Sequence, residues 1–96
     1  MTPEAKVKAK VKKILDSLEE CYYFFPQTGG YGRSGVPDII VCYKSIFIAI
    51  ECKAGKGQLT ELQKYNIDQI KQAKGLAIMI NESNIEMLLP QLKEIL

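Results

Sequence analysis

The stretch that decides the fold is PDIIVCYKSIFIAIECK, residues 37–53. It holds two apolar runs, Ile39–Tyr43 and Ile46–Ile50, whose β-branched and aromatic residues predict strands. Lys44 and Ser45 lie between the runs and predict a tight reversal of the chain. We therefore expect an antiparallel hairpin whose two strands are apolar on both faces, as in a sheet that helices cover on both sides.

Polar residues flank this hairpin at matching ends. If the reversal is centred on Lys44-Ser45, facing residues have numbers that add to 89, and Asp38 then faces Glu51. Directly opposed residues hold their Cβ atoms about 4.5–5.5 Å apart, and two carboxylates at that separation repel unless a cation lies between them. Clustered carboxylate oxygens suit Mg²⁺ or Mn²⁺. Lys53 projects from the same strand face as Glu51, so the pattern predicts a metal site with an adjacent ammonium group, suited to chemistry on phosphates.

A plainer interpretation remains open for these charges. Asp38 can simply precede a strand, and Glu51 and Lys53 can form a solvent-facing pair, as charged residues near strand ends commonly do. The register is the critical assumption, because Lys-Ser is not a favoured two-residue turn. A slip of one residue would place the two carboxylates on opposite faces of the sheet.

Pro37-Asp38, an apolar hairpin and Glu51-Cys52-Lys53 together resemble the signature of the PD-(D/E)XK nuclease superfamily. More narrowly, the chain resembles a stand-alone VRR-NUC (virus-type replication–repair nuclease) domain. The further matches are Glu4 in a first helix, a glycine-rich approach at residues 29–35, and Gln63 at the start of a later helix. The resemblance runs from Glu4 to about residue 80.

The expected fold is α/β, a small mixed sheet flanked by helices with a restriction-endonuclease-like core. Antiparallel strands are expected at Cys21–Phe25, Asp38–Tyr43 and Ile46–Lys53. A capping box at Thr60–Gln63 opens a helix that runs to about Lys74, with Gly75 as its stop. A right-handed crossover through this helix makes the strand Leu76–Ile80 parallel to its neighbour.

The resemblance implies a metal-dependent nuclease that hydrolyses DNA phosphodiester bonds, in the context of replication, recombination or repair, with branched or junction DNA as the expected substrate. Asp38, Glu51 and the backbone carbonyl of Cys52 would hold Mg²⁺, for which Mn²⁺ would substitute. Lys53 would orient or help deprotonate the attacking water and balance the charge of the transition state.

Two further site residues have a structural alternative. The resemblance assigns Glu4 to the metal site, but a glutamate in a first helical turn is also favoured by the helix dipole. It places Gln63 beside the metal as a catalytic residue, but Gln63 can equally reach back to cap its own helix.

Contacts with nucleic acid are expected from basic residues outside the metal site. Lys6, Lys10 and Lys13 lie on the first helix, where a charged face can also be merely solvated. Arg33 belongs to the glycine-rich approach, which can wrap a phosphate backbone or serve as a plain connection. Lys56 follows the predicted metal site directly.

Composition bounds the remaining possibilities. The 96 residues make one domain, 1–96, with a formal net charge of +2 and no histidine. The lack of histidine excludes catalytic triads that need an imidazole and zinc sites with histidine ligands. The three cysteines are an odd number, and Cys42 and Cys52 fall inside predicted strands, so we expect buried thiols in a reducing compartment and no disulfide framework. No apolar run is long enough to span a membrane, and no signal peptide is apparent, so we expect the cytoplasm of a bacterial or phage-infected cell.

Two alternatives concern activity and assembly. The chain could be a catalytically silent nucleic-acid-binding module that keeps a nuclease fold, although paired carboxylates would be out of place facing a polyanion.

The expected partners are DNA and a second copy of the chain. The homodimer is expected from the apolar residues of segment 85–96, which exceed what one small sheet face readily buries, unless the segment packs as a kinked helix on its own sheet.

Overall fold

The computed structural model describes residues 1–27 and 34–95. Along the chain the elements are α1 (Pro3–Asp16), β1 (Cys21–Phe24), β2 (Ile39–Tyr43), β3 (Ile46–Cys52), α2 (Glu61–Gln72), β4 (Leu76–Ile80), the 3₁₀ helix η1 (Ile85–Met87) and α3 (Leu88–Lys93). None of the described helices is long and apolar enough to cross a membrane.

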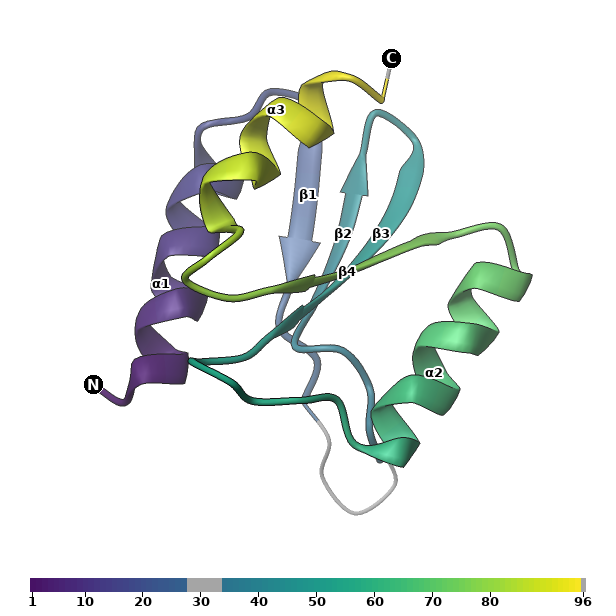
Figure 1. Cartoon of the computed structure of the whole chain (residues 1–96). Helices are drawn as coiled ribbons and strands as arrows, with labels where there is room; N and C mark the ends of the chain where they lie inside the picture. Colours follow the sequence, from purple (N-terminus) through teal and green to yellow (C-terminus); the bar gives the residue numbers. More distant parts are fainter. Residues whose placement is uncertain (28–33, 96) are drawn as a thin grey trace.

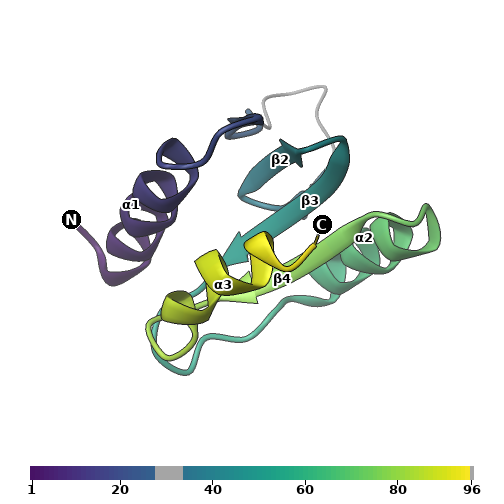
Figure 2. The same ribbon diagram turned by 90° about the horizontal axis from the view of Figure 1, so that it is seen from above.

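The four strands form one mixed sheet in the order β1-β2-β3-β4. β1 and β2, and β2 and β3, pair antiparallel, whereas β4 pairs parallel to β3 after the crossover through α2. Figure 1 shows α1 and α3 together beside the sheet, with α2 well apart from them. Figure 2, seen from above, shows α1 and α2 at opposite sides of the molecule, with α3 and β4 between them. The predicted α/β fold, a small mixed sheet flanked by helices, is confirmed.

The β2–β3 hairpin has the predicted register. Tyr43 pairs with Ile46 and Ile39 with Ile50, so continuation of the ladder by one residue places Asp38 opposite Glu51. Lys44 and Ser45 have φ values of 51° and 69°. Two positive φ values are typical of the type I′ turn, whose twist matches that of the strands. Each of these residues adopts a left-handed conformation that costs about 1 kcal/mol or more, which the packed strands outweigh.

One face of the sheet builds the main core. Alternate residues of β2 and β3 pack there against α1 and α3, and the fully buried side chains include Val11, Leu15, Val41, Ile50 and Leu92. α1 begins as predicted, with Thr2 accepting a hydrogen bond from the backbone of Ala5 and Pro3 in the first turn. The helix therefore presents its N-terminal turns at a fixed position beside the end of β3.

α2 covers part of the opposite face of the sheet. Its start agrees with the prediction, and its end does not. The capping box at its start is present in full, whereas Gly75 is not the left-handed residue at its end. Lys74 takes that conformation, with φ 73°, and the amide of Gly75 bonds to the carbonyl of Ile70 at 2.9 Å. Glycine is needed at 75 for space, because a Cβ would lie 2.9 Å from Ile70 and 3.0 Å from Phe47.

The C-terminal segment packs on its own sheet. Ile85, Leu88 and Leu92 are buried in the main core, while Met87 is the member that is clearly exposed. Pro90 lies in the first turn of α3, where its missing amide hydrogen costs no helical bond. The surplus of apolar surface expected of this segment is therefore largely absent among its described residues, and Leu96 lies outside them.

Candidate active site

Asp38 lies directly before β2 and bridges two other elements. Its Oδ2 accepts a hydrogen bond from the backbone amide of Cys52 at 2.8 Å. Its Oδ1 forms an ion pair with the Nζ of Lys8 from α1 at 3.3 Å. The carboxylate is thus fixed by the end of β3 on one side and by the first helix on the other.

Glu51 lies in β3 and is nearly inaccessible, with 3% of its surface exposed. Burial, followed by the neighbouring Asp38 carboxyl, raises the pKa of Glu51 to about 8, although the Lys53 ammonium acts in the opposite direction. Its Oε2 is buried and has no hydrogen-bond partner among the described residues. An acceptor oxygen left without a partner in the interior is costly, and it suits a cation that binds beside it.

Lys53 follows β3, and its amide still donates to the carbonyl of Ile80 at 2.9 Å. A turn comes next, in which the amide of Gly57 bonds to Ala54 and the amide of Gly55 donates to Glu82 Oε1 at 2.8 Å. The first bond closes the turn, and the second ties it to the segment that follows β4. The ammonium of Lys53 lies close enough to Glu51 to oppose the rise of its pKa, as the shared strand face predicts.

Gln63 caps its own helix, as one of the two alternatives expects, and its side chain also reaches Glu51. Its side-chain Oε1 accepts a hydrogen bond from the backbone amide of Thr60 at 2.9 Å, and the backbone amide of Gln63 donates to the Thr60 hydroxyl at 3.1 Å. Its Nε2 lies 3.4 Å from Glu51 Oε1, as a hydrogen-bond donor. One side chain therefore caps α2 and holds one oxygen of Glu51.

Lys8 also belongs to the site, although it is not among the site residues predicted from the sequence. Burial lowers the pKa of its ammonium, but the facing Asp38 and then Glu4 more than compensate, so that the pKa is raised overall. The available signal was spacing: Lys8 follows Glu4 by four residues and hence lies on the same face of α1.

The approach to Asp38 is held by α2. Gly35 has φ +75°, and a Cβ at this position would lie 2.7 Å from Leu62 Cγ, so only glycine fits. The buried amide of Asn66 donates to the carbonyl of Ser34 at 3.0 Å and to that of Leu62 at 2.9 Å. This anchor could not be predicted from the sequence, because neither Ser34 nor Asn66 carries a charge or belongs to a recognisable capping motif.

Glu4 and the backbone carbonyl of Cys52 are the other two predicted metal ligands. Glu4 is half-buried in the first turn of α1, and its charge acts on Glu51, Lys8 and Cys52. Burial, followed by Asp38 and Glu51, raises the pKa of the Cys52 thiol to about 12, so the backbone of Cys52 is the better candidate ligand. Among residues 1–27 and 34–95, no three acidic, cysteine or histidine side chains are grouped closely enough to hold a metal ion.

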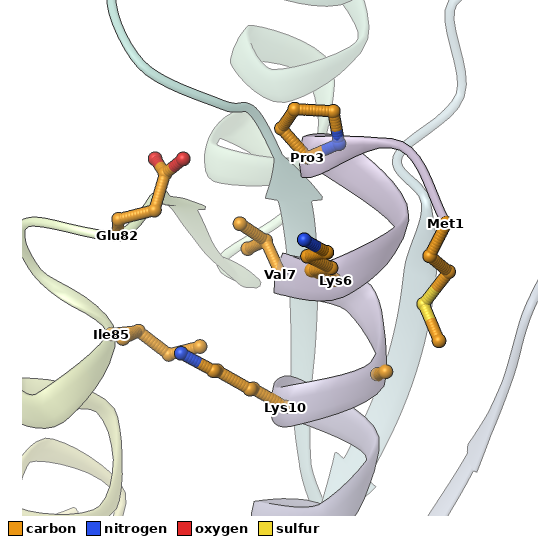
Figure 3. A pocket seen from close by; sticks show the side chains of 8 residues that line it. Met1, Pro3, Lys6, Val7, Lys10, Glu82 and Ile85 are labelled. Atoms are coloured by element: carbon orange, nitrogen blue, oxygen red, sulfur yellow. The ribbon is translucent and has the colours of Figure 1, made fainter.

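The predicted basic contacts separate into two groups. Lys6, Lys10 and Lys13 are exposed, and none of them forms an ion pair with another described residue. Lys6 and Lys10 line a cavity of about 410 Å³ that also includes Glu82 and Ile85 (Figure 3). Lys56 is exposed in the turn after Lys53. The predicted contact at Arg33 lies outside the described residues.

The donor set fits a divalent cation by its chemistry. Asp38, just before β2, and Glu51, in β3, supply carboxylate oxygens, and one oxygen of Glu51 is buried without a partner among the described residues. Hard oxygen ligands of this kind are those that Mg²⁺ prefers. A lysine ammonium and a side-chain amide donor also lie near the carboxyl group of Glu51.

Comparison with known proteins supports the fold. No protein-family model matches the sequence, and no curated protein matches it closely enough to be counted as a relative. A solved structure described as a VRR_NUC domain is 17% identical, with a TM-score of 0.67 over 98% of this chain and 94% of that one. A second, described as a VRR_NUC domain protein, has the same identity and TM-score and is covered over 88% of its length. The resemblance seen in the sequence is confirmed at the level of structure: this chain has the fold of a VRR-NUC domain.

Proposed function

We propose that this nuclease-fold domain is a Mg²⁺-dependent nuclease that hydrolyses DNA phosphodiester bonds, with branched or junction DNA as its substrate. Mn²⁺ would support the same reaction in place of Mg²⁺. The observation that carries the proposal is the buried, unpartnered Oε2 of Glu51 beside Asp38. A purely structural carboxyl would gain nothing from this position, because its burial and the neighbouring carboxyl both oppose ionisation.

Each residue of the site has a definable task. Asp38 and Glu51 would hold the cation together with the carbonyl of Cys52, and Glu4 would assist through water. Gln63 orients Glu51 by binding its other oxygen at 3.4 Å. Lys53 would hold the attacking water and offset the negative charge that develops on the phosphate. When bound, Mg²⁺ would polarise the phosphodiester and make a water molecule more acidic.

The lysines outside the site would bind the DNA backbone. Lys6, Lys10 and Lys13 recur at spacings of four and three residues, so they form one exposed stripe along α1. Lys8, which pairs with Asp38, comes two residues after Lys6 and therefore lies on the opposite side of α1 from this stripe. The three cysteines are free thiols, in keeping with the reducing bacterial or phage-infected cytoplasm that we propose as the setting.

A cleavage assay tests the proposal. Labelled linear, nicked, flapped and four-way DNAs are incubated with Mg²⁺, with Mn²⁺ or with EDTA. Glu51→Gln and Asp38→Asn keep the shape of the side chains and should each lower the rate more than about 100-fold, since loss of an outer partner alone costs 10–100-fold. Glu86→Gln removes an exposed carboxylate elsewhere and serves as the matched control. Equal metal-dependent cutting by all four proteins would refute the assignment.

A second candidate function is a nucleic-acid-binding module without catalysis. The observation in its favour is the ion pair between Lys8 and Asp38, because an internal ammonium already balances that carboxylate. DNA binding without cleavage of any substrate in the same panel, by a protein that does not take up Mg²⁺ in a calorimetric titration, would select this function.

A further inference from the structure

Two exposed aromatic side chains lie at one edge of the sheet, on the face opposite α1 and α3. β1 is the edge strand furthest from β4, against which α2 packs. Tyr22 and Phe24 on β1 are 71% and 47% exposed. The residues that alternate with them, Cys21 and Tyr23, pack toward the main core instead. The ring centroids of Tyr22 and Phe24 lie 6.4 Å apart, so the two rings form one apolar surface, which we call the aromatic pair.

The strand register places the aromatic pair on the same face as the candidate site. Phe24 pairs with Ile40, and Ile40 pairs with Ala49. Continuation of the ladder puts Asp38 and Glu51 in the next row of this face, because side chains two residues apart on a strand project from the same side. One row is about 7 Å along the strands and one strand is about 5 Å across, so the Cα atoms of Phe24 and Asp38 are roughly 8 Å apart. The aromatic pair therefore begins one row away from the carboxylates.

The chemistry of this face suits the bases of a nucleic acid more than its phosphates. The described residues that share the face between the aromatic pair and the site carry no charge, namely Ile40, Cys42, Phe47 and Ala49. A nucleic-acid strand combines charged phosphates with flat bases that stack on aromatic rings. The candidate metal site and Lys53 suit a phosphate, and the aromatic pair suits the faces of the bases beside it.

The exposed area of this face is small for a protein partner. An aromatic side chain buries 150–250 Å², so the exposed parts of Tyr22, Phe24 and Phe47 together offer roughly 350 Å². A standard protein interface buries about 800 Å² on each partner. Stacking needs much less, because each base requires only one ring. Two exposed rings therefore match one or two bases.

We propose that Tyr22 and Phe24 stack the unpaired bases of a DNA strand whose adjoining phosphodiester lies at Asp38 and Glu51. The placement of the phosphate rests on the proposed function, whereas the stacking itself does not. A duplex presents base edges in its grooves, and only unpaired bases offer their faces to a side chain. The aromatic pair thus selects substrates with a single-stranded segment beside the scissile bond. It reads no particular sequence, because every base has a π face.

Binding of single strands in EDTA tests the stacking without any cleavage. Fluorescence anisotropy compares a labelled oligothymidylate of about ten nucleotides with an abasic oligomer of equal length, which keeps the phosphates and lacks the bases. Wild type should bind the oligothymidylate about 5–100-fold more tightly, the range expected for stacking of one base. Tyr22→Leu and Phe24→Leu should each lower this preference at least about fivefold and leave the affinity for the abasic oligomer unchanged. Tyr65→Leu alters an exposed aromatic residue on α2 and is the matched control.

Equal affinity of the wild type for the two oligomers, including no binding of either, overturns the proposal. The same holds if Tyr22→Leu and Phe24→Leu keep the wild-type preference. A mass in light scattering that changes in these variants while the preference persists would assign the face to a protein contact. A cleavage assay in Mg²⁺ separates this test from that of the proposed function. Wild type that prefers bases but cuts no DNA would retain the stacking surface and lose the nuclease assignment, whereas intact cutting without the preference would do the reverse.

Discussion

Replacing Glu51 by glutamine should remove a strong pH dependence from the stability of the metal-free protein. The pKa of Glu51 is raised from its ordinary value of 4.5 to about 8, first by burial and then by the facing Asp38. A folded-state pKa above the unfolded one means that the native protein retains a proton which the unfolded chain has lost. The contribution of protonated Glu51 to the free energy of unfolding is therefore fully present below pH 4.5 and is lost as the pH rises through about 8.

The interval between these two pKa values sets the magnitude. At about 1.4 kcal/mol for each pKa unit, the ceiling is roughly 5 kcal/mol. Small movements of the side chain and entry of water reduce the penalty of an ionised carboxylate. We therefore expect the wild-type protein to lose about 2–3 kcal/mol of unfolding free energy relative to Glu51→Gln between about pH 5 and pH 9.

Urea denaturation in EDTA across this pH range measures the difference. Glu86→Gln is the control, because its carboxylate is exposed and its profile should run parallel to that of the wild type. Excess Mg²⁺ at the alkaline end should restore the wild-type protein through ligand linkage and leave Glu51→Gln nearly unchanged. Parallel profiles for wild type and Glu51→Gln would show that Glu51 is not held protonated by its surroundings.

Three further outcomes are expected. Lys53→Ala should slow cleavage by roughly 10²–10⁴-fold while Mg²⁺ affinity changes by less than about tenfold; lost affinity with an intact single-turnover rate would contradict its role. Lys8→Met should tighten Mg²⁺ binding by about 3–10-fold in calorimetry, because it removes the ammonium that lies 3.3 Å from Asp38 and competes with the cation for this carboxylate. Weaker Mg²⁺ binding by this variant would show that Lys8 does not compete with the metal. Substituting Lys6, Lys10 and Lys13 together by glutamine should make the slope of log affinity against log salt shallower by up to about three, and an unchanged slope would mean that this face is only solvated.

Much of the fold could be predicted because apolar runs and register constrain each other. Tyr43 and Ile46 face each other as expected, although Lys44-Ser45 is a poor turn sequence. The hairpin forms because the buried faces of β2 and β3 permit one register, and the turn adopts two left-handed residues as a result. Packing thus overrides the local preference of the turn.

The candidate site was predicted less completely, for two physical reasons. Lys8 enters it through the packing of α1 against the end of β3, and its spacing from Glu4 indicates only that the two residues share a helix face, not that this face meets Asp38. Asp38 also satisfies the buried amide of Cys52, so Asp38→Ala would leave an unpaired donor at a cost of about 1–3 kcal/mol. A sequence shows that a carboxylate is present, but not which backbone group it will serve.

The double use of Gln63 narrows the amino acids that this position tolerates. Glutamate is an equally common partner in a capping box and would cap α2 as well. Beside Glu51, however, it would replace an amide donor with a third negative charge. Alanine would free Glu51 but release the start of the helix. Only an uncharged side chain of this length, with an acceptor at one oxygen and a donor at the adjoining nitrogen, serves both neighbours, so folding and chemistry select the same residue for different reasons.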